Sequence, residues 1–99
     1  MGGDVLAASK KAVQGAVSGA AEVGKDLGTT AVAAVESVIN TAKSVGVNTT
    51  KATQEAVVGA ITAADRIGSE AGQTVRNALS TAASLPKDVV QKVIKKAPK

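Results

Sequence analysis

Small residues recur at every fourth position in two stretches of this chain, and the two stretches match when one is shifted by 44 residues. Ala8, Ala12, Val13, Gly15, Ala16, Ala20, Gly24, Gly28, Thr30 and Ala34 fall on Ala52, Ala56, Val57, Gly59, Ala60, Ala64, Gly68, Gly72, Thr74 and Ala78. The charged residues between them differ freely. Residues four apart form one ridge of a helix, so a ridge of small side chains indicates close approach of backbones rather than chemistry.

Apolar residues recur at spacings of three and four along both stretches, and no segment alternates as a strand would. Their average spacing is near 11/3, which is typical of straight or slightly right-handed helical packing. The sequence therefore predicts an all-α fold. We expect a small helical bundle made of two tandem repeats of about 44 residues, followed by a short basic C-terminal helix.

Glycine, N-cap residues and proline indicate where the helices begin and end. Gly46 and Asn48 are typical of a helix end and a helix start, and Pro86 fits a first turn. We predict helices at 4–27, 30–45, 49–83 (bent near 72) and 86–96. The domain organisation that follows is a duplicated body at 1–86, with repeat 1 at about 4–47 and repeat 2 at about 48–86, and a basic amphipathic segment at 87–99.

The repeated small residues are the first candidate site, a surface for helix packing. It comprises Ala12, Gly15, Ala16, Ala20, Gly24, Ala56, Gly59, Ala60, Ala64 and Gly68. These faces either pack against each other within one chain or remain open for another chain. Because the chain has no Phe, Tyr or Trp, its core buries little area per residue. A second copy supplies further burial, so we expect a homo-oligomer, most simply a two-fold dimer.

The excess positive charge lies at the C-terminal end. Residues 1–86 are neutral overall, whereas the last 13 residues carry five lysines and Asp88 alone. The second candidate site is a contact with an anionic surface through Lys87, Lys92, Lys95 and Lys96. A basic amphipathic helix of this kind binds a membrane interface. The alternative is a short helix that closes the end of the bundle and exposes its lysines to solvent.

The residue types needed for catalysis are scarce. The chain has no His for proton transfer near neutral pH and no Cys nucleophile. Glu22 and Asp26 lie one helical turn apart, a spacing that lets two carboxylates share a metal ion. The equivalent residues in the second repeat are Arg66 and Glu70, which instead suit an ion pair on one helix and indicate a solvated face. We therefore expect no enzyme activity, cofactor, metal or small-molecule substrate. A nucleic-acid partner is not expected, because stacking aromatics are absent.

Long Ala/Val/Gly/Thr helices with an 11-residue period are similar in period and composition to synucleins, perilipins and late-embryogenesis proteins. Those proteins cover lipid or protect under stress, but their Lys-Thr-Lys-Glu-Gly-Val type of repeat is absent here, so no functional residue carries over. Uncharged runs such as 12–21 are half the length of a membrane span, and no secretory signal is visible. We expect a cytoplasmic, non-enzymatic structural or interaction protein. The alternative is a peripheral protein of lipid or membrane surfaces.

Overall fold

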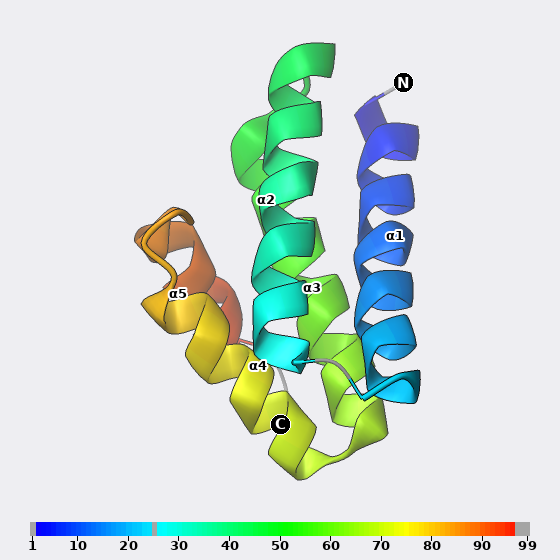
Figure 1. The fold of residues 1–99 in the computed structure, drawn as a ribbon. Coiled ribbons are helices and arrows are strands. Elements are labelled where there is room, and N and C mark those ends of the chain that lie inside the picture. The colour runs from blue at the N-terminus through cyan, green and yellow to red at the C-terminus, as the bar shows by residue number, and fades with distance from the viewer. Residues whose placement is uncertain (1, 25, 97–99) are drawn as a thin grey trace.

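The computed structural model describes residues 2–24 and 26–96, and these form five α-helices without a strand (Figure 1). The helices are α1 (Gly2–Glu22), α2 (Leu27–Val45), α3 (Thr49–Ile67), α4 (Ser69–Thr81) and α5 (Lys87–Lys96). The all-α prediction is confirmed.

Two of the helix starts are capped by the side chain that precedes them. The Asp26 carboxylate accepts a hydrogen bond from the Thr29 amide at 3.1 Å, and the Asn48 side chain accepts one from the Lys51 amide at 3.0 Å. These bonds satisfy amides that lack a partner in the first turn. At the other end of α2, Gly46 adopts a left-handed φ of 91° and donates its amide to the Ala42 carbonyl at 2.9 Å. Only glycine adopts this C-terminal conformation readily.

The predicted helix at 49–83 is wrong, because the chain breaks at Gly68 into α3 and α4. The first helix likewise ends at Glu22, and the turn that follows contains Gly24 with a φ of 75°. We expected breaks near residues 28 and 72, four residues further along in each repeat. Gly28 and Gly72 instead lie inside helices and are buried. The turns therefore form at the first glycine of each pair, and the second glycine serves close packing.

Helix α3 lies at the centre of the bundle and contacts each of the other four helices. Helices α1 and α2 lie side by side in front of it, α4 runs obliquely beneath, and α5 lies at the side of the bundle next to α4 (Figure 1). The core consists of aliphatic side chains, chiefly valine and alanine. Its members are Val13, Val17, Ala20, Ala31, Val35, Val38, Ala42, Ala52, Ala56, Val57, Ala60, Ile61, Ala63, Ala64, Val75, Leu79, Leu85, Val90 and Val93.

Candidate functional site

The small-residue row of the second repeat lies on the central helix. Ala56, Gly59, Ala60 and Ala64 are buried, and Gly68 is half-buried at the turn between α3 and α4. A Cβ atom at Gly59 would stand 2.7 Å from the backbone oxygen of Lys10. This separation is below any ordinary contact, so the missing side chain is what allows α1 and α3 to approach.

The equivalent row of the first repeat lies differently. Ala20 is buried and Ala16 is half-buried, whereas Ala12, Gly15 and Gly24 are exposed. Helix α1 turns another face toward the bundle, where it buries Val13, Val17 and Ala20. The two rows therefore do not lie in equivalent surroundings, because α3 is enclosed by helices and α1 is covered on one side.

The outward face of α1 carries small side chains that no other helix covers. We name it the α1 outer stripe, and it consists of Ala8, Ala12, Gly15 and Gly19 with Val23, the residue that follows the helix; all five are exposed. A Cβ atom added at Gly15 or Gly19 would meet nothing within 4 Å. The Val23 amide donates to the Gly19 carbonyl at 3.3 Å, which places Val23 one turn beyond Gly19.

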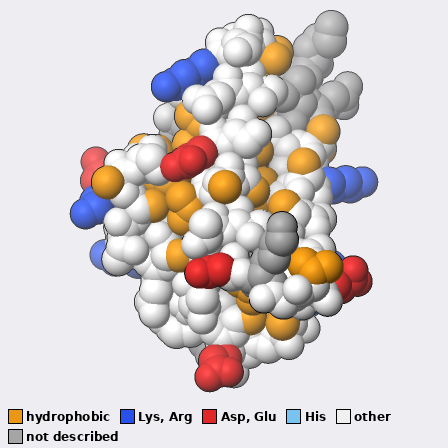
Figure 2. Space-filling view, viewed as in Figure 1, with side chains coloured by type: hydrophobic (Ala, Val, Ile, Leu, Met, Phe, Trp, Pro, Cys, Tyr) orange, Lys and Arg blue, Asp and Glu red, His pale blue; other side chains and the backbone are white. Residues whose placement is uncertain are grey.

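Val23 is the most exposed large hydrophobic residue among those described, at 68% of its surface. Basic and acidic side chains lie along the α1 edge of the space-filling view, with small white and orange groups between them (Figure 2). Ala12 and Gly15 belong to the predicted packing surface, whereas Gly19 and Val23 do not. The spacing of four from Gly15 to Gly19 is common in helices and does not by itself indicate a contact, and Val23 continues the same spacing.

Helix α5 divides its apolar and basic residues between two sides. Val90 and Val93 are buried in the core, whereas Lys87, Lys92, Lys95 and Lys96 are all exposed. The preceding residue Leu85 is also buried, so the chain docks before the helix begins. The apolar face thus packs against α3 and α4, and the lysines form an exposed basic surface.

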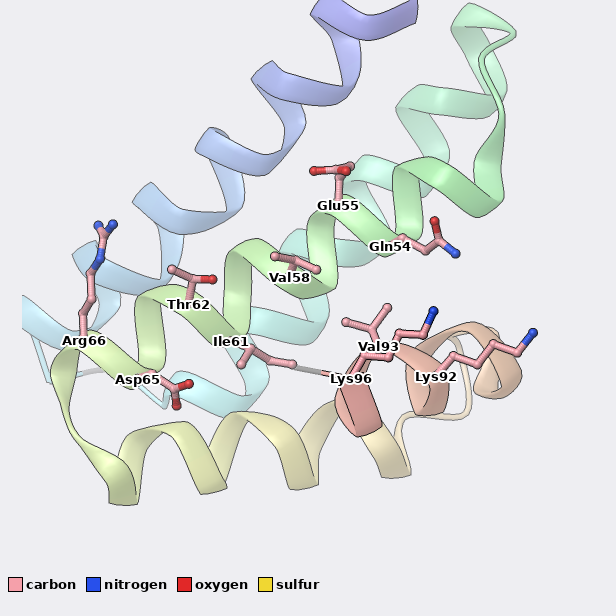
Figure 3. A pocket seen from close by; sticks show the side chains of 10 residues that line it. All are labelled: Gln54, Glu55, Val58, Ile61, Thr62, Asp65, Arg66, Lys92, Val93 and Lys96. Carbon is pink, nitrogen blue, oxygen red and sulfur yellow. The ribbon is translucent and has the colours of Figure 1, made fainter. Parts of the chain in front are cut away.

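An open groove of about 680 Å³ lies between α3 and α5 (Figure 3). We name it the α3–α5 groove; its lining residues are Gln54, Glu55, Val58, Ile61, Thr62, Asp65, Arg66, Lys92, Val93 and Lys96. The aliphatic side chains lie in the middle, and the two lysines extend from the α5 wall. The groove was not predicted from the sequence, since nothing in the spacing of residues indicates that α5 folds back beside α3.

An ion pair joins the two helices that meet at Gly68. The Arg76 guanidinium donates two hydrogen bonds to the Asp65 carboxylate, at 2.8 and 2.9 Å. Hydrogen bonding to Asp65 raises the pKa of Arg76 above its ordinary value. The expected pairing of Arg66 with Glu70 is wrong, because the break at Gly68 puts these residues on different helices, and the structure pairs Arg76 with Asp65 instead.

The ion pair passes directly over Gly72. A Cβ atom there would lie 2.0 Å from the Asp65 carboxylate oxygen and 2.9 Å from the Arg76 guanidinium. Glycine at this position therefore leaves the space that the pair occupies. A second polar link, from the Ser84 hydroxyl to the Glu36 carboxylate, ties the segment before α5 to α2.

Catalytic and metal-binding arrangements were sought across residues 2–24 and 26–96. No group of three or more acidic, His or Cys residues stands close enough to hold a metal ion in this part of the chain. None of the described helices has both the length and the apolar character that crossing a bilayer requires. Comparison with protein-family models, curated proteins and solved structures gave no match to this chain.

Proposed function

We propose that this chain is a non-enzymatic structural or interaction protein that self-associates through the α1 outer stripe. The observation that carries this proposal is the stripe itself, which ends in a valine exposed over 68% of its surface. The small residues Ala8 to Gly19 permit the close helix approach that Gly59 already supports inside the bundle. Covering Val23 with an apolar surface of another copy removes its side chain from water, which favours association.

An antiparallel two-fold pairing of α1 fits the charges beside the stripe. Lys11 and Glu22 are both exposed and 11 residues apart, about three helical turns, so they lie on the same edge of α1. They stand at similar distances on either side of the centre between Gly15 and Gly19. Two copies related by a two-fold axis at that centre therefore bring Lys11 of each copy beside Glu22 of the other.

We also propose that the bundle derives from two tandem repeats of about 44 residues, within the body at 1–86. The equivalent glycines Gly24 and Gly68 both occupy turns, and the equivalent glycines Gly28 and Gly72 are both buried within helices. In each repeat a helical hairpin results, α1 with α2 and α3 with α4. This correspondence supports duplication more strongly than residue identities alone.

Sedimentation of charge variants tests the self-association. Lys11→Glu and Glu22→Lys each place like charges together in the antiparallel pair, so each weakens association. The double variant K11E/E22K restores opposite charges and is expected to regain it. Measurements over a hundredfold range of protein concentration follow the monomer and dimer populations.

Lys51→Glu serves as the control, because Lys51 is exposed on α3 and lies outside the stripe. It changes the net charge as Lys11→Glu does and should leave association unaltered. A wild-type chain that sediments as a monomer throughout contradicts the proposal. Failure of the double variant to recover contradicts the antiparallel arrangement.

The alternative function is that of a cytoplasmic protein that binds peripherally to an anionic lipid surface. The exposed lysines of α5 favour it, namely Lys87, Lys92, Lys95 and Lys96. Binding of this kind leaves Val90 and Val93 in the core and relies on charge alone. It predicts co-sedimentation with phosphatidylglycerol vesicles that is lost as salt rises, since surface attraction is screened.

A further inference from the structure

We infer that the α3–α5 groove binds a monomeric anionic amphiphile, a molecule with an aliphatic chain and a single acidic head group. The site involves helices α3 and α5 and none of the α1 outer stripe, so it goes beyond the proposed self-association. Its volume of about 680 Å³ lies within the range of small-molecule sites, about 300–1,000 Å³.

The middle of the groove is aliphatic. Val58 on α3 is half-buried, and Ile61 and Val93 beside it retain only 2% and 8% of their surface exposed. Figure 3 shows Val58 and Ile61 on α3 and Val93 on α5 between the polar side chains at the two ends. An aliphatic chain laid over these three residues removes its own apolar surface from water, together with that of Val58, because Ile61 and Val93 are already buried.

The charge of the lining selects an anion. Lys92, Lys96 and Arg66 line the groove, and within the described part of the chain none of them has an ion-pair partner. Of the two acidic lining residues, Asp65 is held by Arg76 through two hydrogen bonds. Glu55 alone therefore opposes three cations, which leaves the groove positive.

The two lysines fix where the head group lies. Lys92 and Lys96 are one turn apart on α5, and their amino groups extend in a similar direction at one end of the groove (Figure 3). Arg66 extends from the opposite end, away from the two lysines. A carboxylate between the two lysines accepts hydrogen bonds from both, which are stronger than those between neutral groups. The aliphatic chain then runs along α3 past Val58.

The test uses decanoate below the concentration at which it forms micelles. Titration into the ¹⁵N-labelled protein is followed by amide chemical shifts, and shifts are expected on α3 and α5 around Val58 and Val93. Decyltrimethylammonium, which has the same chain length and the opposite charge, should bind at least about tenfold more weakly. Equal binding of the two amphiphiles overturns the selection of an anion.

Charge variants on one helix provide the matched control. Lys92→Glu with Lys96→Glu removes both cations from the groove and should weaken decanoate binding about tenfold or more. Lys87→Glu with Lys95→Glu makes the same change of net charge on the same helix outside the groove, and should leave binding within about twofold. Lys92→Arg with Lys96→Arg preserves the charge and should retain binding. Circular dichroism confirms that each variant remains helical.

Three further outcomes overturn the proposal. One is equal weakening by the two glutamate pairs, which indicates attraction to the net charge alone. Another is the appearance of decanoate shifts away from α3 and α5. The third is binding of phosphatidylglycerol vesicles without any binding of monomeric decanoate, which assigns the lysines to a lipid surface. Monomeric protein in sedimentation overturns the self-association and leaves this inference standing.

Discussion

Gly15 and Gly59 coincide when the sequence is shifted by 44 residues but have opposite surroundings. A Cβ atom at Gly59 would stand 2.7 Å from the Lys10 backbone oxygen, whereas one at Gly15 would meet nothing within 4 Å. Alanine favours a helix interior over glycine by about 1 kcal/mol. At Gly59 this gain is opposed by a contact with a backbone atom that cannot move aside, and overpacking typically costs about 1–3 kcal/mol.

We therefore predict that Gly59→Ala lowers the free energy of unfolding and that Gly15→Ala raises it by up to about 1 kcal/mol. Denaturant unfolding at low protein concentration, where the chain is monomeric, measures both. Gly19→Ala is a second control, since it too has open space around the added methyl group. Similar effects at Gly15 and Gly59 contradict the close approach of α1 and α3.

Asp26 makes the stability of the bundle depend on pH. The hydrogen bond from the Thr29 amide lowers the pKa of Asp26 from its ordinary value of 3.8, because it favours the charged carboxylate. The stabilisation from this hydrogen bond is complete above pH 3.8, and it is lost as the pH falls through the lowered pKa of Asp26 in the folded protein. Asparagine caps a helix at any pH. Between about pH 7 and about pH 2, the melting temperature of the wild type should thus fall more than that of Asp26→Asn.

At the scale of the helices, the sequence predicted their type and most of their ends, because caps and apolar periodicity act locally. The start of α3 after Asn48 and the end of α2 before Gly46 were predicted. Helix α2 begins after Asp26, three residues before the predicted start at 30. The break at Gly68 was misplaced because two glycines four residues apart give equal local signals. Only packing distinguishes them, since Gly72 leaves space for the ion pair of Asp65 with Arg76.

The α3–α5 groove could not be predicted from the sequence either, because it also depends on how the helices pack. Val58 and Val93 lie 35 residues apart, and their proximity depends on how α5 folds back from Leu85. The α1 outer stripe was predicted in part. Its small residues are visible in the sequence, whereas their exposure follows from the position of α1 at the side of the bundle.

The burial of one face of α5 predicts which of its valines stabilise the bundle. Val90 is fully buried, whereas its neighbour Val89 is half-buried. Val90→Ala should lower the free energy of unfolding by about 1–3 kcal/mol, and Val89→Ala by less. Urea unfolding of the full chain compares the two. Equal small losses show that α5 is not held in the core.

The whole molecule is compact although its core lacks aromatic residues. Its radius of gyration is 12.1 Å, against about 13 Å expected for a chain of 100 residues. Small side chains permit this, because helices whose contacts are alanine and glycine lie closer together. The same small side chains bury little apolar area each, so the isolated bundle has little surplus stability. The proposed association through α1 would add burial without requiring larger residues in the core.

The central position of α3 has a consequence for synthesis of the chain. Helix α1 buries Val13 and Val17 in a core whose centre, α3, is complete only at Ile67. Ribosomes add roughly 5–20 residues per second, so roughly 2–9 s pass between the emergence of Glu22 and that of Ile67. During this interval α1 has α2 alone as a neighbour, and its apolar face is available to chaperones or to a neighbouring nascent chain.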